Sequence, residues 1–510
     1  MEGLDITVLR LSEVGTNNDK FRIDAGYFAK LPVLTEGRIE ALPHMRLGAV
    51  CSVFRKGIFD IKASSYAEVG VPFVRIGNIR NGLIDSNDIA LITPKSHAAE
   101  GNTALKFGDI VLSKTAYAAA AFVNLPDCNV SQDTIALRLS SYGRTQFKSG
   151  YIVAYLNSRY GLALMSRQFQ GNVQEHLSLP DGQKILVPLF NDELQSVIDQ
   201  AIRDAHEHLR IAHEGIGTSE VSLVAALGIG EWNPPEPLAY TRKASEVLAA
   251  NRVDAEFHRP KVDALFCKLA STFNLRNLGE LGVVENGQTV LYDENGTIPI
   301  IRSGDLSDID DDSRFLRTDS STPIFKLKRG DVLVSSIGFG SIGKIQVFDK
   351  AGTYGTVSEV TVIRQNEMNP YYLASFLRSR FGQMQIDRYI TGATGQLHLY
   401  KRDVRKFFLP EIPDHEQKRF ELLAREAFEA RAQARTSLEK AKRAVEIAIE
   451  DSEAAALKYL KQSRTIYACQ LLARDPLASA NWAKAPLARS AGSKAPGLTR
   501  KSAVPSGVSG

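Results

Sequence analysis

Residues 151–161 read YIVAYLNSRYG, and residues 372–382 read YLASFLRSRFG. Four further segments recur in the same order, namely residues 22–27 at 252–257, 71–79 at 298–306, 105–110 at 327–332 and 188–195 at 410–417. Every pair is separated by 221 to 230 positions, whereas chance similarities would scatter over many separations. The period is far longer than the roughly 20–50 residues of solenoid repeats. The sequence therefore predicts a duplicated domain with small insertions.

The composition is typical of a globular protein with a core in each copy. The chain has 510 residues, of which 44% are hydrophobic and 24% are charged. Each copy, at roughly 190 residues, is long enough to bury its own apolar core. The sequence has no long apolar run, and its N-terminal part shows no basic segment followed by an apolar stretch. It therefore predicts neither a membrane span nor a secretory signal. Four isolated cysteines without a CxxC pair favour a reducing cytoplasm over a disulfide framework or a zinc site.

Positive charge is concentrated near the end of the chain. The net charge is +4, but the segment from Pro476 onward holds five basic residues and no acidic one, so the rest carries about −1. Overall charge therefore does not identify a nucleic-acid-binding protein. Residues 475–510 are rich in Ala, Ser, Gly, Pro and Lys and are expected to form a disordered basic tail. The alternative interpretation of this tail is non-specific attraction to phosphate.

Each copy begins with short β-like runs and continues into a helix. The runs are dense in β-branched residues and are bounded by turn signals. They comprise residues 71–76 and 109–113 in the first copy, and 298–302, 331–335, 344–348 and 357–363 in the second. Apolar residues at helical spacing predict helices over residues 151–168 and 369–389. We expect a compact α+β domain in which strands supply rigidity and loops supply recognition.

A helix of a different character follows the first copy. From Asp192, apolar residues recur every three or four positions. The helix is expected to end near Gly215 and Gly217, before a short apolar segment at residues 221–227. The proline-rich residues 232–237 then predict a rigid linker.

The second copy is followed by a longer helix of the same kind. From Asp414 the apolar rhythm continues for more than four heptads, and Gln417 is the expected capping-box partner at its start. Charged residues fill the other faces, which is typical of a coiled-coil seam. Neither long helix buries its stripe alone, but the two can cover each other. Antiparallel pairing would place the two copies at opposite ends of a rod of roughly 50 Å.

Residues 233–236 (NPPE) resemble the (N/D)PP(Y/F) loop of amino-methyltransferases. In that loop the aromatic residue stacks on a flipped base, but here Glu236 occupies its position. No glycine-rich cofactor loop precedes the segment. A linker is therefore the favoured interpretation.

Residues 338–344 (GFGSIGK) match the spacing GxGxxG. A dinucleotide site needs a strand, then this loop, then a helix. Here the β-like sequence IQVF follows, which indicates a hairpin loop. The open alternatives are a structural turn and a flexible loop that carries Ser341 and Lys344 towards DNA phosphates.

His206, Glu207, His208 and His213 resemble an incomplete metal-binding motif. A zincin helix needs two histidines four residues apart, and position 210 is arginine. A solvated face of the first long helix is favoured instead. No nuclease, nucleotide-binding or nucleophile motif is convincing, so the chain is expected to be non-catalytic.

Three kinds of short string stand at equivalent places in the two copies. They are a proline junction before each long helix (VPL at 187–189, LP at 409–410), a Gly-Asp strand start (108–109, 330–331) and a glycine-containing loop (GNVQ at 171–174, GATGQ at 392–396). In this order, the strings make the chain similar to the DNA-specificity subunit of type I restriction–modification enzymes over roughly residues 15–460. The first junction departs from the pattern, because NDELQ replaces an acidic-Glu-Gln run, and the tail lies outside it.

The resemblance implies an α+β fold with two similar mixed α/β target-recognition domains, separated by two long helices that pair as an antiparallel coiled coil. The expected units are recognition domains at residues 1–191 and 229–412, a central spacer helix at 192–228, a C-terminal spacer helix at 413–465 and the basic tail at 475–510. Each recognition domain would read half of a bipartite site in double-stranded DNA.

The resemblance also implies partners. Two methyltransferase subunits would carry S-adenosylmethionine and methylate adenine, and motor-nuclease subunits would use ATP and Mg for cleavage. This chain would be a non-catalytic subunit without its own cofactor or metal. The alternatives are a coiled-coil scaffold with duplicated protein-binding domains and a self-contained DNA-modifying enzyme, although two copies leave little room for a catalytic core.

Candidate DNA-contacting residues are polar side chains at strand ends and in loops, where base edges and phosphates can be reached. In the first copy they are Arg75, Asn78, Arg80, Asn81, Lys114, Tyr117, Gln174 and His176. In the second copy they are Arg302, Ser303, Asp305, Ser336, Ser341, Lys344, Gln396 and His398. The alternative for each is an exposed loop residue or a turn cap.

The two copies differ at several candidate positions. Asn78 stands opposite Asp305, and Lys114 stands opposite Ser336, which predicts halves that read different sequences. By contrast, the Arg-x-Asp strings at residues 22–24 and 252–254 are expected to form structural ion pairs within each copy.

Overall fold

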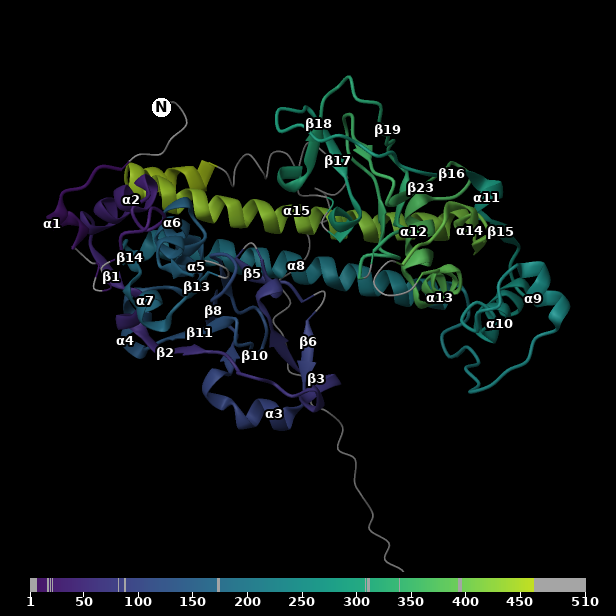
Figure 1. The fold of residues 1–510 in the computed structure, drawn as a ribbon, viewed down its shortest axis with the longest axis horizontal. Helices are drawn as coiled ribbons and strands as arrows, with labels where there is room; N and C mark the ends of the chain where they lie inside the picture. The colour runs from purple at the N-terminus through teal and green to yellow at the C-terminus, as the bar shows by residue number, and fades with distance from the viewer. Residues whose placement is uncertain are drawn as a thin grey trace, which may run out of the picture.

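The computed structural model describes residues 7–462, except 16–17, 19, 21, 81, 87–88, 172–174, 308, 310–311, 339 and 393–396. The expected tail over residues 475–510 lies outside the described residues, as do the candidate site residues Asn81, Gln174 and Gln396. Two mixed α/β modules lie on opposite sides of a pair of long helices (Figure 1). We call residues 22–190 the first module and residues 252–412 the second module. The expected α+β class is confirmed.

The central pair consists of α8 (Asp192–Ala226) and α15 (Asp414–Glu450), which run antiparallel (Figure 1). At one end, Glu193 of α8 faces Lys461, just beyond α15, with an N–O distance of 3.4 Å. Near the middle, Ala212 packs against alanines of α15. Small side chains allow close approach, so each helix covers the apolar stripe of the other. The expected antiparallel coiled coil is confirmed.

Helix α8 is longer than its glycines predict. Gly215 and Gly217 do not end it, and it continues to Ala226. A Cβ at Gly215 would lie 3.5 Å from the Cβ of Ala427, so this glycine faces the partner helix. A glycine inside a helix costs only about 1 kcal/mol relative to alanine. Burial of Leu223 in the core of the second module outweighs that cost, and the predicted helix end is wrong.

Gln417 does not cap α15. Its Oε1 accepts a hydrogen bond from the N–H of Asn369 (2.8 Å), and its Nε2 donates to the carbonyl oxygen of Ile412 (2.8 Å). The predicted capping box is wrong because this side chain bonds to the neighbouring helix instead. Gln195 has the same role in the first module and accepts from the N–H of Lys148 at 3.1 Å. A repeated glutamine thus ties each long helix to its module.

After α15 the chain bends, and residues 453–462 resume as a helix. Leu460 of this segment is buried in the core of the first module. Glu453 accepts a hydrogen bond from the N–H of Asn191 at 3.1 Å. The continuous helix expected over residues 413–465 is therefore interrupted, and the segment after the bend covers the start of α8.

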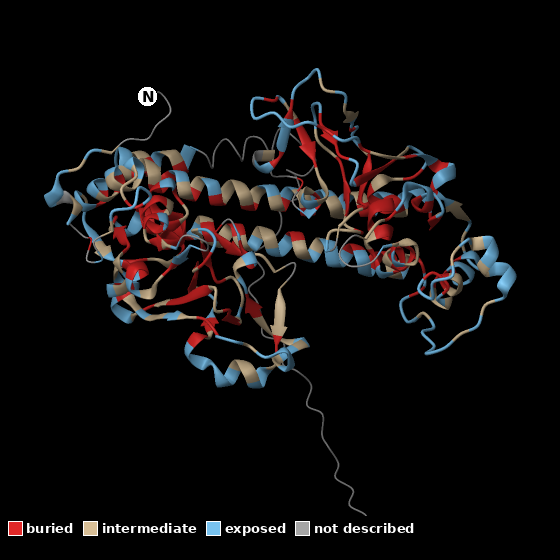
Figure 2. Cartoon of the chain, viewed as in Figure 1, coloured by how far each residue is buried: buried red, intermediate tan, exposed pale blue. Residues whose placement is uncertain are grey.

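The first module holds two main sheets. The six-stranded sheet has the order β2-β11-β8-β9-β5-β4 (Cys51–Lys56, Thr134–Leu139, Ile110–Ser113, Ala120–Phe122, Leu83–Ile84, Ile79–Arg80). The four-stranded sheet has the order β6-β3-β10-β7 (Ala90–Ile92, Tyr66–Val74, Asp127–Val130, Leu105–Lys106). Helix α2 (Lys30–Glu40) precedes the sheets, and α5 (Ser149–Leu156) and α6 (Arg159–Arg167) follow them. The main core lies where the larger sheet meets α5 and α8 (Figure 2).

The second module repeats this plan. One sheet has the order β16-β23-β20-β21 (Gly282–Asn286, Val360–Gln365, Val332–Ser335, Ile345–Val347). The other has the order β18-β17-β22-β19 (Leu316–Thr318, Ile298–Ile301, Gly355–Thr356, Phe325–Lys326). Helix α10 (Pro260–Ala270) precedes the sheets, and α12 (Pro370–Arg378) and α13 (Arg380–Tyr389) follow them. As in the first module, the first of these two following helices packs against the long pair.

The helices expected over residues 151–168 and 369–389 are each split in two. Ser158 and Ser379 cap the second helix of each pair, and their hydroxyls accept from the N–H groups of Gly161 (3.3 Å) and Gly382 (3.5 Å). Capping serines satisfy N–H groups at the start of a helix. The expectation of one continuous helix is wrong. Apolar residues keep helical spacing on both sides of the break, so the pattern does not reveal it.

The best-matched repeat segments contact the proline junctions directly. The hydroxyl of Tyr151 donates to the carbonyl oxygen of Pro188, and that of Tyr372 donates to the carbonyl oxygen of Pro410, both at 2.6 Å. Both tyrosines are fully buried. A buried hydroxyl needs such a partner, so these segments and junctions form one unit in each module.

The Gly-Asp strand starts form a second repeated unit. Gly108 and Gly330 have φ values of +92° and +90°, which glycine adopts without strain. Asp331 then accepts from the N–H of Lys328 at 2.8 Å and from two guanidinium nitrogens of Arg364, both at 2.7 Å. Asp109 makes the equivalent bonds in the first module, with Arg138 as its cation. One carboxylate thus holds the turn and anchors the neighbouring strand.

The Arg-x-Asp strings form the expected ion pairs. Arg22 pairs with Asp24, and Arg252 pairs with Asp254, each with a shortest N–O distance of 2.7 Å. The hydrogen bond from Arg252 and the N–H of Phe257 lower the pKa of Asp254 below its ordinary value of 3.8, although burial opposes them. The prediction of structural pairs is confirmed.

This lowered pKa predicts a pH-dependent stability. Because the folded pKa of Asp254 lies below the unfolded value of 3.8, its stabilising contribution is present above that pH and is lost as pH falls through the folded pKa. We expect Asp254→Asn to lower Tm at pH 7. At pH 3 the difference in Tm between this variant and the natural protein should be smaller. Thermal unfolding followed by circular dichroism at both pH values measures this. Glu236→Gln, in the exposed linker, is the control, and an Asp254→Asn deficit that does not change with pH would contradict the assignment.

Candidate nucleic-acid interface

Three segments that are distant in sequence meet at one edge of the first module. The N–H of Leu177 donates to the carbonyl oxygen of Lys114 at 2.7 Å, and Thr115 forms a single antiparallel bridge with His176. The hydroxyl of Tyr117 donates to the carbonyl oxygen of Ile76 at 2.9 Å, which adds the turn after β3. The structure therefore brings the separately predicted residues of this module together. We call this edge the first edge.

The second module builds the same edge from equivalent segments. The N–H of Leu399 donates to the carbonyl oxygen of Ser336 at 2.8 Å, and Ile337 forms a single bridge with His398. Lys344 Nζ donates to Ser307 Oγ at 2.8 Å, which adds the turn after β17. We call this the second edge. In both modules backbone bonds join the first two segments, whereas different side chains, Tyr117 and Lys344, add the third.

The loops after β8 and β20 hold unusual backbone at matching places. Ala116 has a φ of +63°, and Gly338 has a φ of +110°. A non-glycine residue with positive φ is strained and is retained only where its surroundings require it. The N–H of Ala116 donates to the carbonyl oxygen of Glu175 (3.3 Å), and that of Gly338 donates to that of Leu397 (3.2 Å). The positive φ therefore accompanies the junction between segments at each edge.

Two lysines lie close together at the first edge. Burial and the charge of Lys56 lower the pKa of Lys114, whereas the charge of Asp133 raises it. Strand pairing places the two lysines on the same side, because Lys56 of β2 pairs with Ile135 of β11, and Ser113 of β8, which precedes Lys114, pairs with the adjacent Thr134. Adjacent ammonium groups attract an anion such as phosphate. The candidate residues did not include Lys56, which becomes a neighbour of Lys114 only through the sheet order.

The exposed candidates of the first edge are Arg75, Arg80, Tyr117 and His176. Asn78 is buried instead, and its amide is committed to the turn. Its Oδ1 accepts from the N–H of Arg75 at 2.9 Å, and its Nδ2 donates to the carbonyl oxygen of Asp85 at 3.1 Å. Asn78 therefore shapes the turn that presents its neighbours.

Asp305 makes the same turn cap as Asn78. Its carboxylate accepts from the N–H of Arg302 at 2.9 Å and from the Nε of Arg302 at 3.2 Å. Asn78 and Asp305 thus have the same structural role. From the sequence alone, the difference between them predicts that the two modules recognise different DNA sequences. Ser336 is also fully buried, and its hydroxyl contacts Thr361 Oγ1 at 2.5 Å.

The remaining candidates of the second edge are half-buried and held by neighbours. Ser303 Oγ donates to Glu359 at 3.3 Å, and Ser341 Oγ donates to the carbonyl oxygen of Ile337 at 3.0 Å. The ring of His398 stacks on Tyr400, with centroids 6.0 Å apart. The polar atoms of this edge are therefore ordered before any ligand arrives.

The second edge also carries groups that were not predicted. The guanidinium of Arg402 lies over the ring of Tyr400, 5.2 Å from its centroid, and its side chain is 79% exposed. Together with His398, these side chains form a stack of flat groups. Such stacks contact sugars, bases or phosphates in nucleic acids. The signal in the sequence is the string HLYKR at residues 398–402, which comes just after the glycine-containing loop of the second copy.

The GxGxxG string lies in a hairpin. β20 and β21 pair antiparallel on either side of it, and the described chain continues from it into a strand. The predicted hairpin loop is confirmed, and the arrangement excludes the strand–loop–helix form of a dinucleotide site.

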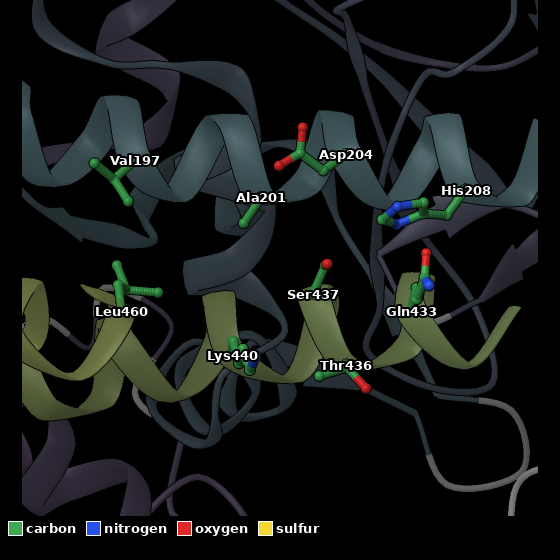
Figure 3. Close-up of a pocket in the computed structure, with 9 residues that line it drawn as sticks. All are labelled: Val197, Ala201, Asp204, His208, Gln433, Thr436, Ser437, Lys440 and Leu460. Atoms are coloured by element: carbon green, nitrogen blue, oxygen red, sulfur yellow. The ribbon is translucent and has the colours of Figure 1, made fainter. Parts of the chain in front are cut away.

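The histidines of α8 are half-buried, and the prediction of a solvated face is wrong. The ring of His206 lies 5.5 Å from that of Phe107, because the first module covers this side of the helix. His208 lines a groove of about 220 Å³ between the long helices (Figure 3). The groove is lined by Val197, Ala201, Asp204, His208, Gln433, Thr436, Ser437, Lys440 and Leu460.

The described part of the chain holds neither a metal cluster nor a membrane helix. Within it, no group of three His, Cys, Asp or Glu side chains is arranged to hold a metal ion. Within the same residues, every helix is too short or too polar to cross a bilayer.

Comparison with known proteins identifies one family. Residues 270–420 match the family model described as Type I restriction modification DNA specificity domain. No curated protein matches the chain. Among solved structures, the chain is similar to the type I restriction–modification S subunit from M. genitalium, with 13% identity, a TM-score of 0.35, and coverage of 82% of this chain and 95% of that one. It is also similar to the HsdS subunit from Thermoanaerobacter tengcongensis, with 19% identity, a TM-score of 0.26, and coverage of 80% and 95%.

The second module is therefore a DNA-specificity domain of the type I restriction–modification class. The first module repeats segments of the second module in the same order. Residues 270–420 therefore belong to the DNA-specificity domains of type I restriction–modification systems, as the resemblance in the sequence predicts.

Proposed function

We propose that the chain reads a bipartite site in double-stranded DNA, with one half read at the first edge and the other at the second edge. The recognition domains extend over residues 1–191 and 229–412, and the spacers, residues 192–228 and 413–465, contain the long helices α8 and α15. The reading side chains are Arg75, Arg80, Lys114, Tyr117 and His176 at the first edge, and Arg302, Ser303, Ser341, Lys344 and His398 at the second. Lys56 and Arg402 join them.

One observation carries this proposal: the two edges share a backbone construction and differ in side chains. Lys114 is a cation, whereas Ser336 at the equivalent position is a buried hydroxyl. Base readout depends on which donors and acceptors face a groove, and cations fix the register on the backbone. A shared frame with different side chains supports the reading of two different sequences.

The long helices set the distance between the two readings. Helix α8 has 35 residues, which corresponds to about 50 Å at 1.5 Å per residue. One turn of B-DNA is about 34 Å. A rigid pair of this length supports half-sites that lie on separate turns of one duplex.

The family supports an assembly in which other subunits perform the chemistry. Two methyltransferase subunits bind the chain, carry S-adenosylmethionine and methylate adenine in the site. Motor-nuclease subunits that use ATP and Mg complete the cleaving complex. The groove between α8 and α15 in Figure 3 offers a surface for these subunits, since both helices are accessible there.

A matched pair of variants tests the two readings. Methylome sequencing of cells that contain the complex first supplies the split motif. Duplexes with single base changes in either half are then bound by the assembled complex. We expect Arg75→Ala to abolish discrimination in one half only and Arg302→Ala to abolish it in the other. Each good base contact is worth roughly 1–3 kcal/mol of discrimination, so roughly 5- to 150-fold in Kd.

Other outcomes point to the alternatives. Equal loss in both halves from either variant would contradict separate reading. Binding without sequence preference at any salt concentration would favour a scaffold of protein-binding domains. S-adenosylmethionine binding by the chain alone would favour a self-contained enzyme.

A further inference from the structure

An exposed aromatic side chain stands in the loop that follows β2 at the first edge. Phe59 lies within the string RKGIFDIK at residues 55–62, which holds three cations and one carboxylate. The residue is 71% exposed, and Lys56 Nζ lies 4.4 Å from the centroid of its ring. A ring of this size in water forgoes the stabilisation that burial would give. The surrounding positive charge favours a polyanion as the partner that covers it.

Backbone bonds fix the start of this loop on the sheets. The N–H of Gly57 donates to the carbonyl oxygen of Thr134 at 3.1 Å, and the N–H of Ile58 donates to that of Val130 at 2.8 Å. Ile58 is buried. A Cβ at Gly57 would lie 2.4 Å from the carbonyl oxygen of Val130, so this close approach requires glycine. Phe59 therefore projects from a loop whose start is held in place.

The loop begins between two segments that carry candidate DNA-contacting cations. On one side, the N–H of Lys114 donates at 2.8 Å to the carbonyl oxygen of Asp133, which precedes the acceptor of the loop on β11. On the other side, Ser131 forms a parallel bridge with Ile58, and its N–H donates at 2.9 Å to the residue before Arg75. The ring therefore belongs to the same edge as both cations.

The residue after Phe59 has an unusual backbone conformation. Asp60 has a φ of +52°, and the chain bends at these two residues. Aspartate tolerates the left-handed region better than most residues, but the conformation remains strained. Strain of this kind is kept where the surroundings or the function require it. Here it accompanies the bend that carries the exposed ring.

The second module builds the same loop start without the ring. The N–H of Gly287 donates to the carbonyl oxygen of Val360 at 3.0 Å, and that of the next residue donates to Thr356 at 3.2 Å. Gly287 follows Gly57 by 230 positions, the spacing of the Arg-x-Asp strings. The position equivalent to Phe59 is Thr289, which is also exposed. Because the loop forms without an aromatic residue there, the ring is not needed to build it.

We propose that Phe59 enters the DNA at the first half-site as an apolar wedge between two neighbouring base pairs, with Lys56 on an adjacent phosphate. This inference rests on the proposed function. Apolar side chains inserted at a base step unstack it and kink the duplex. The ring leaves water to stack on bases, and the ammonium group beside it meets the backbone charge. With Thr289 at the equivalent place, the second half-site is not deformed in this way.

The wedge adds a preference for DNA shape to the first half-site. Pyrimidine–purine steps unstack and kink more easily than other steps. The half-site read at the first edge is therefore expected to contain such a step where Phe59 enters. Selection at this step depends on the ease of deformation, in addition to hydrogen bonds to base edges.

Fluorescence of 2-aminopurine, which rises when the base is unstacked, tests the wedge in the complex assembled with its methyltransferase subunits. The probe is placed at successive positions of both half-sites. We expect one step, in the half where Arg75→Ala abolishes discrimination, to give a signal that Phe59→Ala removes and Phe59→Trp retains. Phe59→Ala should weaken binding by about tenfold, the scale of one base–aromatic stack. Its slope of log K against log salt should not change, whereas Lys56→Gln should lower that slope by about 0.9.

Two variants are matched controls. Tyr142 is 56% exposed in α4 (Ser141–Gln146), which follows the opposite end of β11 from the loop. Tyr142→Ala should change neither the affinity nor the signal. Thr289→Ala should leave the signals of both half-sites unchanged. Because Phe59 is exposed, Phe59→Ala should also leave Tm unchanged.

A change in the DNA tests the wedge without altering the protein. A strand nick at the step that gives the signal lowers the cost of kinking and keeps every base. We expect the natural complex to bind the nicked duplex more tightly than the intact one and Phe59→Ala to bind both equally. A nick that has the same effect on both proteins would overturn the inference.

Two further results would overturn the inference. One is the absence of any step whose signal depends on Phe59. The other is weaker binding by Phe59→Ala with every signal unchanged, since the ring would then contact DNA without entering it. Failure of the proposed function is distinguishable from these results, because it would appear as a natural complex without sequence preference.

Discussion

Replacing Asp331 with alanine is expected to lower the free energy of unfolding of the second module by about 3–5 kcal/mol, the usual loss when a buried ion pair is broken from one side. The Asp331 side chain is 1% exposed and accepts from Arg364 through two nitrogens. Its loss leaves the N–H of Lys328 and the Nε of Arg364 without their acceptor, and the guanidinium keeps only the carbonyl oxygen of Lys326. Urea unfolding followed by circular dichroism measures the change.

A double-mutant cycle separates the ion pair from the turn. We expect Asp331→Ala with Arg364→Ala to be less destabilising than the sum of the two single changes, because the double variant leaves no unpaired charge. Asp109→Ala should have a similar effect on the first module, since Arg138 contacts Asp109 in the same way. Additive effects at residues 331 and 364 would contradict a coupled pair.

The second large effect concerns two glycines at helix corners. A Cβ at Gly382 would lie 2.4 Å from both the carbonyl oxygen of Phe376 and the Cα of Leu377. A Cβ at Gly161 would lie 2.0 Å from the carbonyl oxygen of Tyr155. These neighbours are backbone atoms and cannot move aside. We expect Gly161→Ala and Gly382→Ala each to destabilise their module by about 3 kcal/mol, the upper range for overpacking.

Gly217→Ala is the matched control for these two changes. Gly217 lies inside α8, and no described atom outside its own helix turn lies within 4 Å of the place that a Cβ would take there. Alanine at this position should raise stability by up to about 1 kcal/mol through helix propensity. Differential scanning calorimetry of all three variants compares them directly. If Gly161→Ala and Gly217→Ala change the stability by similar amounts, the backbone around Gly161 can move to accommodate a Cβ, which would contradict the prediction.

The repeat and the coiled coil could be predicted from sequence because both depend on periodicity. Apolar spacing identifies a helical stripe wherever it occurs. The helix ends could not be predicted in the same way. Gly215 is tolerated because the partner helix approaches there, and Gln417 leaves its expected cap because Asn369 needs an acceptor. Both outcomes depend on neighbours that are distant in sequence.

The candidate site likewise contains features that the sequence predicts and features that it does not. Candidate residues at strand ends, such as Arg75 and Lys114, both lie at the first edge although β3 and β8 belong to different sheets. The hydroxyl of Tyr117 joins the two segments by its bond to the turn after β3. Asn78 is indistinguishable from its neighbours in sequence, yet it is buried as a turn cap. Lys56 was not a candidate, because only the strand order places it on the same side of the sheet as Lys114.

The bend after α15 has a topological consequence. Arg159 of the first module contacts Glu450 at 2.6 Å, and Lys461 contacts Glu193. The described chain therefore returns to the module from which it set out. Module, helix, module and helix follow one another along the chain, and the last helical segment ends beside the first module. The arrangement in space is therefore cyclic and gives neither module a distinct first position. The order of the modules along the peptide is therefore one of several possible circular permutations of the same arrangement. Each module contacts the two long helices in an equivalent way.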